Sequence, residues 1–316
     1  MNRTNPLAVL TVLCGGLGLV ASGPARAASG PRDGRVPIDQ VCVAFGCFPG
    51  DAPGWPVEIT QPGAYVLTSN LDVTGQPSPE NVTAVVVSVS GVDLDLGGFA
   101  LHGPASCVDD WPVTCQPASG SGDGVRVTAS ATALHVHDGN ITGFGGNGVV
   151  AAANLLNIER VRFAHMRLTA VTVVGGGLGA RISNVVVGFC GGGGVKITGD
   201  LGAVLDSSIG AVSAAVATAG FAQVQTNALN SRGSGAIGIT SGSASRLAGL
   251  SVQGSQAIFA GNGSLVLDST LDSDSPILDC GPNVGYNGLN MHVGVQPEVN
   301  GSCLSFGQNQ CANNRC

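Results

Sequence analysis

The sequence is poor in charged and aromatic side chains. Only 10% of its 316 residues are charged and 4% are aromatic, whereas 44% are hydrophobic and 50 are glycine. Low charge with this much hydrophobicity excludes ordinary intrinsic disorder, and glycine without a three-residue period excludes a collagen-like chain. The stretch 122–276 has no Trp, no Tyr and one Lys. We therefore expect an ordered body with few of the side chains that usually carry catalysis or sugar stacking.

Helical periodicity with capping residues is also absent, and apolar residues recur in a different pattern. Each repeating unit has an apolar doublet followed by two further apolar positions. The later of these two comes five residues after the earlier, from Val136 and Ile141 to Val266 and Leu271. Three apolar columns at one period predict a unit stacked on copies of itself. The first series is an apolar doublet that returns seven times, at intervals of 24, 22, 24, 21, 21 and 21 residues: Val125/Val127, Val149/Ala151, Val171/Val173, Val195/Ile197, Val216/Thr218, Ile237/Ile239 and Ile258/Ala260.

The spacing of two within each doublet is the period of a β-strand, and glycines such as Gly191 to Gly194 fill the gaps between strands. The Leu-x-x-Leu-x-Leu signature of leucine-rich repeats is missing, and a propeller blade needs about twice this length. The sequence therefore predicts an all-β parallel β-helix. Each unit would be one coil of three short strands, about 4.8 Å from the next coil.

Two motifs near the start of this body resemble a known family. The segments ITQPGAYVLTSNLDV, from Ile59, and VDLDLGGFALHG, from Val92, are similar to the opening coils of secreted bacterial right-handed parallel β-helix repeat proteins. These proteins belong to the pectate-lyase-like superfold. The resemblance covers about 57–276 and implies right-handed coils. Enzymes of this superfold act on acidic polysaccharides, so the resemblance also implies a polysaccharide as a candidate partner.

The chain divides into four predicted regions: a signal peptide at 1–27, an N-terminal segment or cap at 28–56, the β-helix at 57–276 with an insert loop at 104–121, and a Cys-rich C-terminal cap at 277–316. Arg3, an apolar stretch and the small-x-small site ending at Ala27 predict export to a periplasmic or extracellular location. No later run is long enough to predict a transmembrane segment in the mature chain. Cleavage would remove Arg3 and Arg26 and take the formal charge from −7 to −9, which argues against nucleic acid as a partner.

Cysteine usage agrees with export. Cys42 and Cys47 form one local group, Cys107 and Cys115 a second, and the last four a third, so we expect a disulfide in each of the first two groups and two bridges among Cys280, Cys303, Cys311 and Cys316. Zinc is the alternative for the terminal four, although their wide spacing and the lack of a close His disfavour it. Cys190 is left inside a coil, either as a small buried residue with an inert thiol or as a reactive site.

Charged residues supply a few candidate sites. Arg126 and Lys196 point outward from the same predicted strand face, about 14 Å apart, with Thr172 between them. They could bind two carboxylates of a polyuronate, or both could be solvated surface residues. In the insert, Asp109 and Asp110 could hold Ca²⁺ together with the outward Asp93 and Asp95. The alternative is that the acids form turns and an exposed loop tip.

Two histidines share one outer face, because His135 and His137 flank the inward Val136. Such a pair can bind a metal, and His137 beside Asp138 can act as a general base, but no third ligand stands at a readable spacing. A plain surface pair is the alternative. The Phe residues of the body fall mostly at inward positions, so Trp111 in the insert is the main aromatic candidate. Any glycan site is therefore expected at the N-terminal end, around the insert.

Two functions follow from these patterns. The sequence favours a secreted, non-catalytic surface or extracellular protein that binds a glycan or a protein and requires no cofactor. The alternative is a carbohydrate-active enzyme, a lyase or epimerase of an acidic polysaccharide. Arg126 and Lys196 would then bind carboxylates, Asp109 and Asp110 would hold Ca²⁺, and His137 would be the base.

Overall fold

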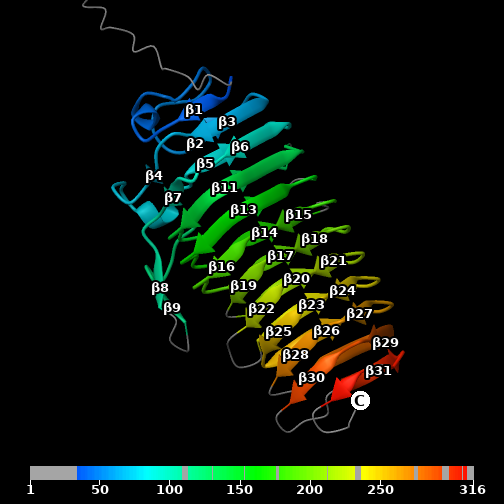
Figure 1. Cartoon of the computed structure of the whole chain (residues 1–316). Helices are drawn as coiled ribbons and strands as arrows, with labels where there is room; N and C mark the ends of the chain where they lie inside the picture. Colours follow the sequence, from blue (N-terminus) through cyan, green and yellow to red (C-terminus); the bar gives the residue numbers. More distant parts are fainter. Residues whose placement is uncertain are drawn as a thin grey trace, which may run out of the picture.

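The protein is a parallel β-helix. The computed structural model describes residues 34–108, 113–129, 131–152, 154–175, 178–211, 213–231, 236–273, 277–293, 299–307 and 309–311. Figure 1 shows the strands stacked along one axis, from the blue β1 (Val36–Ile38) near one end to the red β31 (Val299–Ser305) at the other. The predicted signal peptide lies outside the described residues, as do Asp109, Asp110 and Trp111.

Three columns of parallel strands run along this axis, and the first contains the predicted doublets. Val125 pairs with Val149, Val149 with Val171, and Val171 with Val195. The first column consists of β2 (Val57–Ile59), β5 (Val85–Val87), β10 (Val125–Val127), β12 (Val149–Ala151), β14 (Val171–Val173), β17 (Val195–Ile197), β20 (Ala214–Thr218), β23 (Ile237–Ser241), β26 (Gln256–Ala260) and the first parts of β29 (Leu278–Asn287) and β31.

The second and third columns follow in each coil. The second consists of β1, β3 (Gly63–Leu67), β6 (Val92–Asp95), the first parts of β11 (Leu134–Thr142) and β13 (Asn157–Ala164), β15 (Arg181–Ser183), β18 (Ala203–Leu205), β21 (Gln223–Gln225), β24 (Arg246–Ala248), β27 (Leu265–Leu267) and the last parts of β29 and β31. The third consists of β4 (Leu71–Asp72), β7 (Ala100–His102), the last parts of β11 and β13, β16 (Val186–Gly188), β19 (Ser208–Ala211), β22 (Ala228–Ser231), β25 (Ser251–Gly254), β28 (Thr270–Ser273), β30 (Asn290–Val293) and β32 (Gln310–Cys311).

One predicted doublet was wrong. The structure pairs Val216 with Ile239 and Ile239 with Ile258, so the inward doublet of this coil is Ile239/Ser241 and not Ile237/Ile239. The reason is packing: a side chain at Gly238 would lie 2.2 Å from Val252 Cγ1. Gly238 must therefore occupy the position directly before the doublet, where only a glycine fits. The doublet then begins at Ile239 and not at Ile237.

The corner between the second and third columns explains the five-residue offset between these two apolar series. In the eight coils from Val136 to Tyr286 the chain turns there at a residue with positive φ, two positions after the inward second-column residue, as at Asp138 (φ 57°) after Val136 and Asp206 (φ 50°) after Val204. The inward third-column residue follows three positions later. Gly, Asn and Asp tolerate this backbone region best, and they occupy six of the eight corners, the other two being Arg160 and Thr226: Asp138, Asn184, Asp206, Gly249, Asp268 and Gly288.

The parallel pairing extends beyond 57–276 at both ends. At the N-terminal end β1 pairs with β3, and two short 3₁₀ helices, Cys42–Ala44 and Pro79–Asn81, lie in the connections. At the C-terminal end β29 pairs with β31, and β30 with β32. The described helices include none that is long and apolar enough to cross a membrane.

Three of the expected disulfides are confirmed: Cys42–Cys47, Cys107–Cys115 and Cys280–Cys303. The last of them links adjacent turns near the C-terminal end. The side chain of Cys311 and all of Cys316 lie outside the described residues, so the second C-terminal bridge stays a prediction. Cys190 is a buried free thiol, and burial raises its pKa to about 12. This state matches the inert alternative, because the thiolate is the reactive form.

Candidate functional site

The insert is a β-hairpin that lies against the corner following the third column. Strands β8 (Ser106–Val108) and β9 (Thr114–Gln116) are antiparallel, and Cys107 faces its disulfide partner Cys115. His165 Nδ1 lies 3.1 Å from the backbone N and O atoms of Cys107. A side chain at Gly191 would meet the sulfur of Cys115 at 2.8 Å, so the hairpin packs closely on this corner. In Figure 1 it lies along the side of the coil stack.

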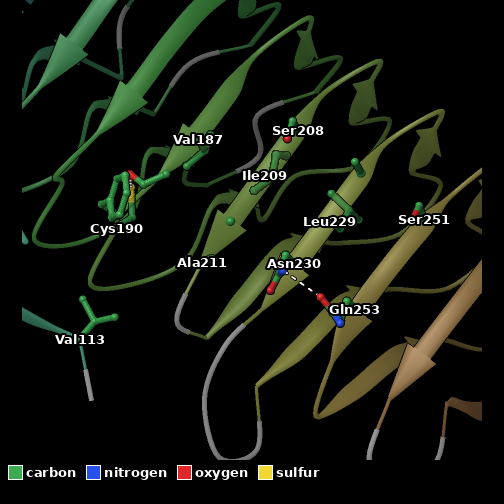
Figure 2. A pocket seen from close by; sticks show the side chains of 14 residues that line it. Val113, Val187, Cys190, Ser208, Ile209, Ala211, Leu229, Asn230, Ser251 and Gln253 are labelled. Atoms are coloured by element: carbon green, nitrogen blue, oxygen red, sulfur yellow. Dashed lines mark hydrogen bonds between the residues drawn. The ribbon is translucent and has the colours of Figure 1, made fainter. Parts of the chain in front are cut away.

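A groove of about 390 Å³ lies beside the hairpin, on the outer face of β16, β19, β22 and β25. These are four successive strands of the third column, so the groove extends about 14 Å along the axis. Figure 2 shows its lining, with Val113 of the insert set apart from the strands and Asn230 hydrogen-bonded to Gln253 across two strands. The Asn230 Nδ2 to Gln253 Oε1 distance is 3.0 Å.

Small residues create the hollow. Gly188, Gly210, Ser208 and Ala228 occupy outward positions of β16, β19 and β22, where other coils carry larger side chains. A Cβ at Gly188 would meet nothing within 4 Å, and one at Gly210 would come no closer than 3.5 Å to another atom. The backbone does not require glycine at either place for space. The missing side chains therefore leave a surface depression and do not serve internal packing.

The groove combines uncharged hydrogen-bonding groups with an exposed aromatic ring. Ser208, Asn230, Ser251 and Gln253 supply hydroxyl and amide groups, and Phe189, which is 47% exposed, supplies the ring. The Phe189 ring stacks on His165, with centroids 5.2 Å apart and planes inclined by 9°. None of the described lining residues is Asp, Glu, Lys, Arg or His. The groove can therefore bind hydroxyl groups but holds no acid–base pair.

Phe189 was not predicted, because the Phe residues of the body were expected mostly at inward positions. Phe144 and Phe163 are buried, but Phe189, Phe221 and Phe259 are exposed. Phe189 and Phe221 have positive φ and stand at corners between columns, which directs them away from the core. A sequence signal exists in hindsight: neither residue falls on one of the three apolar columns.

Arg126, a predicted polyuronate ligand, and Thr172, a binding candidate on the same strand face, belong to one hydrogen-bond network. Arg126 Nη2 lies 2.7 Å from Asp123 Oδ2, and the same group donates to the backbone oxygen of Ser121. Asp123 also accepts a hydrogen bond from Asn147, whose side-chain oxygen accepts one from Thr172 Oγ1 at 3.1 Å. The Arg126 guanidinium is thus already bonded within the chain. The end of the insert reaches Arg126, but the hairpin itself lies on the third-column side.

The structure does not bring Lys196 or His137 close to Arg126. Lys196 is exposed on β17 of the first column, three strands along from Arg126 on β10. His137 lies on β11 of the second column, a different face of the helix. Asp109 and Asp110, the expected Ca²⁺ ligands, fall outside the described residues. The roles given to these residues therefore remain predictions.

The two histidines have a third partner that the spacing did not reveal. Asp93, on the adjacent strand β6, pairs in register with His135. Its Oδ1 lies 2.9 Å from His135 Nδ1 and 3.3 Å from His137 Nε2. The two imidazole rings stack with centroids 4.3 Å apart. The donor atoms of Asp93, His135 and His137 all lie within 4.8 Å of one another, the arrangement of a potential metal site.

Further charges surround this trio. His137 Nδ1 lies 2.7 Å from Asp138 Oδ2, and Arg160 donates two hydrogen bonds to the same carboxylate. The Arg160 bonds hold the pKa of Asp138 well below its usual range. Asp95 is engaged by Arg35 and accepts a hydrogen bond from the backbone of Gly97 at 2.7 Å. Asp95 thus stabilises a corner, which agrees with the prediction that it forms a turn.

Solved structures similar to this fold are pectate-lyase-like β-helix proteins, the class that the opening motifs resemble, and the likeness concerns the fold alone. One is the A-module of the mannuronan C-5 epimerase AlgE6 of Azotobacter vinelandii, with 12% identity, a TM-score of 0.49 and coverage of 87% of this chain and 88% of that one. Another is an alginate lyase from Paenibacillus sp. str. FPU-7, with 11% identity, a TM-score of 0.49 and coverage of 87% and 99%.

A third similar structure is the Dettilon tailspike protein, with 11% identity, a TM-score of 0.44 and coverage of 78% of this chain and 59% of that one. No protein-family model and no curated protein matches the sequence. The likeness to these structures concerns the path of the chain, and at these values it carries no argument about substrate or chemistry.

Proposed function

We propose that this protein is a non-catalytic binding protein for a neutral polysaccharide, which lies along the groove beside the hairpin. The observation that carries the proposal is the lining of the groove. It has hydroxyl and amide groups on successive strands and one exposed aromatic ring, and none of its described lining residues is charged. Export, which the N-terminal sequence predicts and which the three disulfides fit, would place the protein where polysaccharides occur.

The shape of the groove supports an extended ligand. It crosses four strands along the helix axis, and Ser208, Asn230 and Gln253 offer hydrogen-bonding groups on three of them. Asn230 and Gln253 are already joined, so each keeps one fixed orientation and less side-chain freedom is lost on binding. Phe189 at the rim can cover the apolar face of a sugar ring.

The absence of charge in the lining supports a neutral ligand and argues against turnover there. Carboxylates of a polyuronate would lose hydration in the groove without gaining a cationic partner. Glycoside hydrolysis in most families needs two carboxyl groups about 5–9.5 Å apart, and the described lining offers none. Lyase or epimerase activity on an acidic polysaccharide stays the alternative, with Arg126, Lys196 and His137 as its candidates.

The test is to fill the groove without disturbing the fold. Gly210→Leu places a side chain where the nearest atom to the new Cβ is 3.5 Å away. The matched control is Gly75→Leu, an exposed glycine with nothing within 4 Å of a new Cβ. Affinity electrophoresis of the mature chain would compare galactomannan, xyloglucan and β-glucan with alginate and polygalacturonate.

We expect retardation of the wild type by at least one neutral polysaccharide, unchanged by Gly75→Leu and at least tenfold weaker in Gly210→Leu. Binding should change less than twofold between about 0.05 and 0.5 M NaCl, because exposed charges alone are screened strongly over that range. Retardation by the acidic polymers alone, or equal retardation of both variants, would refute the proposal. Formation of unsaturated uronate from alginate or polygalacturonate would favour the enzyme alternative.

A further inference from the structure

A second site lies on another face of the helix, where Asp93, His135 and His137 meet. We propose that these three residues bind a divalent transition-metal ion of the Zn²⁺ class. They come from adjacent strands of the second column, β6 and β11, so a bound ion would link two successive coils. The proposal is independent of the groove, which lies on the third column.

The distances fit a metal-ligand set. Zn²⁺ binds nitrogen and oxygen at about 2.0–2.2 Å, which separates neighbouring ligand atoms in a tetrahedral or octahedral site by about 2.9–3.5 Å. Asp93 Oδ1 lies 2.9 Å from His135 Nδ1 and 3.3 Å from His137 Nε2. Small side-chain rotations would therefore suffice to bring all three atoms onto one ion. Two imidazoles and one carboxylate also leave coordination positions for water.

The hydrogen bond at the other ring nitrogen of His137 supports the same conclusion. Asp138, bonded twice by Arg160, is an acceptor only, so His137 Nδ1 must donate to it across 2.7 Å. In a neutral imidazole, Nε2 then carries a lone pair directed toward Asp93 Oδ1, itself an acceptor, at 3.3 Å. Two acceptors at that distance repel unless a cation lies between them. A carboxylate bonded to the far nitrogen is also the usual support of a metal-ligating histidine.

The charge balance of the cluster points to a bound cation. Four carboxylates surround the histidines, those of Asp93, Asp95, Asp138 and Glu159, whereas the cations placed against them within the described part of the chain are the guanidiniums of Arg35 and Arg160. With neutral imidazoles this cluster keeps a charge of −2, which a divalent ion would cancel.

The donor atoms also decide which metal fits. Ca²⁺ takes six to eight oxygen ligands, whereas imidazole nitrogen suits Zn²⁺, Cu²⁺, Ni²⁺ or Fe²⁺. Asp95 and Asp138 are engaged by Arg35 and Arg160, so they are poorly placed to complete an oxygen cage. Among the described residues, the Ca²⁺ expected from the sequence therefore does not fit this cluster, and a transition metal does.

The experiment titrates Co²⁺, then Zn²⁺, into the chelator-treated mature chain and follows visible absorption, stoichiometry by mass spectrometry, and melting temperature. Variants are His137→Ala and Asp93→Asn at the ligands and Asp138→Asn at the positioning carboxylate. The matched control is His102→Ala, because His102 pairs in register with Asp72 on the adjacent strand but has no second histidine beside it. Far-ultraviolet circular dichroism checks that each variant folds.

We expect one ion per wild-type chain, displacement of Co²⁺ by Zn²⁺, and a melting temperature that rises with metal concentration. His137→Ala and Asp93→Asn should bind at least tenfold more weakly, Asp138→Asn about 10–100-fold more weakly, and His102→Ala like the wild type. No stoichiometric uptake would overturn the proposal. Equal uptake by wild type, His137→Ala and Asp93→Asn would overturn it too.

Discussion

The fit between Gly148 and Phe163 offers a sharp test of how the coils pack. Phe163 is an inward third-column residue with 1% exposure, and a Cβ at Gly148 would lie 2.6 Å from its Cδ1 atom. In the next coil the register places Ala170 where Gly148 stands and Val187 where Phe163 stands. Between these two coils, the smaller core residue accompanies the larger residue before the doublet. The double variant Gly148→Ala/Phe163→Val would copy a pair that the chain already contains.

The magnitudes differ between the single and double variants. Phe163→Val removes most of a buried ring and should cost about 2–4 kcal/mol, near the lower part of the range for large-to-small core changes. Gly148→Ala alone forces a methyl group against the ring and the backbone oxygen of Ala170, at a cost of about 1–3 kcal/mol. In the double variant the ring no longer meets the methyl group, so only the contact with the backbone oxygen of Ala170 remains. The total cost of the double variant should fall below the sum of the two by about 1–2 kcal/mol.

Urea unfolding of the four proteins, followed by far-ultraviolet circular dichroism, measures this coupling. The midpoints and slopes give each free energy of unfolding, and equal slopes show that the same structure unfolds in all four. A double variant whose cost equals the sum of the single costs would refute the complementary packing. So would a Gly148→Ala variant as stable as the wild type.

Two further outcomes follow from buried polar groups. Cys190 should resist iodoacetamide at pH 8–9 in the native chain and react once urea unfolds it, by peptide mass spectrometry, because burial raises its pKa to about 12; native labelling would contradict this. Asn227→Ala should lower the free energy of unfolding by about 1–3 kcal/mol. The Asn227 side chain donates a hydrogen bond to Val204 O and accepts one from Ser207 N, each at 2.8 Å. The outward Asn230→Ala should cost less than about 0.5 kcal/mol, and equal losses would refute the distinction.

The fold could be predicted because its main determinant is written locally in every coil. Val136, Ile158 and Ile182 recur at one spacing and all point inward, so the period alone indicates the stacking. The error at Ile237 arose where two registers were open, Ile237/Ile239 and Ile239/Ser241. Only the close contact of Gly238 with Val252 decides between them, and such a contact is a property of the assembled coil.

The candidate sites were harder to predict because each depends on neighbours from other coils. The third metal ligand, Asp93, stands one coil before His135 and becomes its neighbour only through the register of β6 and β11. The groove is created by what Gly188 and Gly210 lack, and its wall comes from a hairpin whose docking place the spacing does not specify. Arg126 could be predicted from the sequence as an outward cation, but its ion pair with Asp123 could not.

Hydroxyl-radical footprinting of the mature chain, with and without the neutral polysaccharide that retards it most, tests the binding groove most directly. Phe189 and Phe221 form a matched pair, 47% and 60% exposed and both at corners with positive φ, but only Phe189 borders the groove. Polysaccharide bound in the groove should lower oxidation of Phe189 severalfold and leave Phe221 unchanged. Unaltered oxidation of Phe189 at saturating polysaccharide, or protection of Phe221 instead, would contradict binding in this groove.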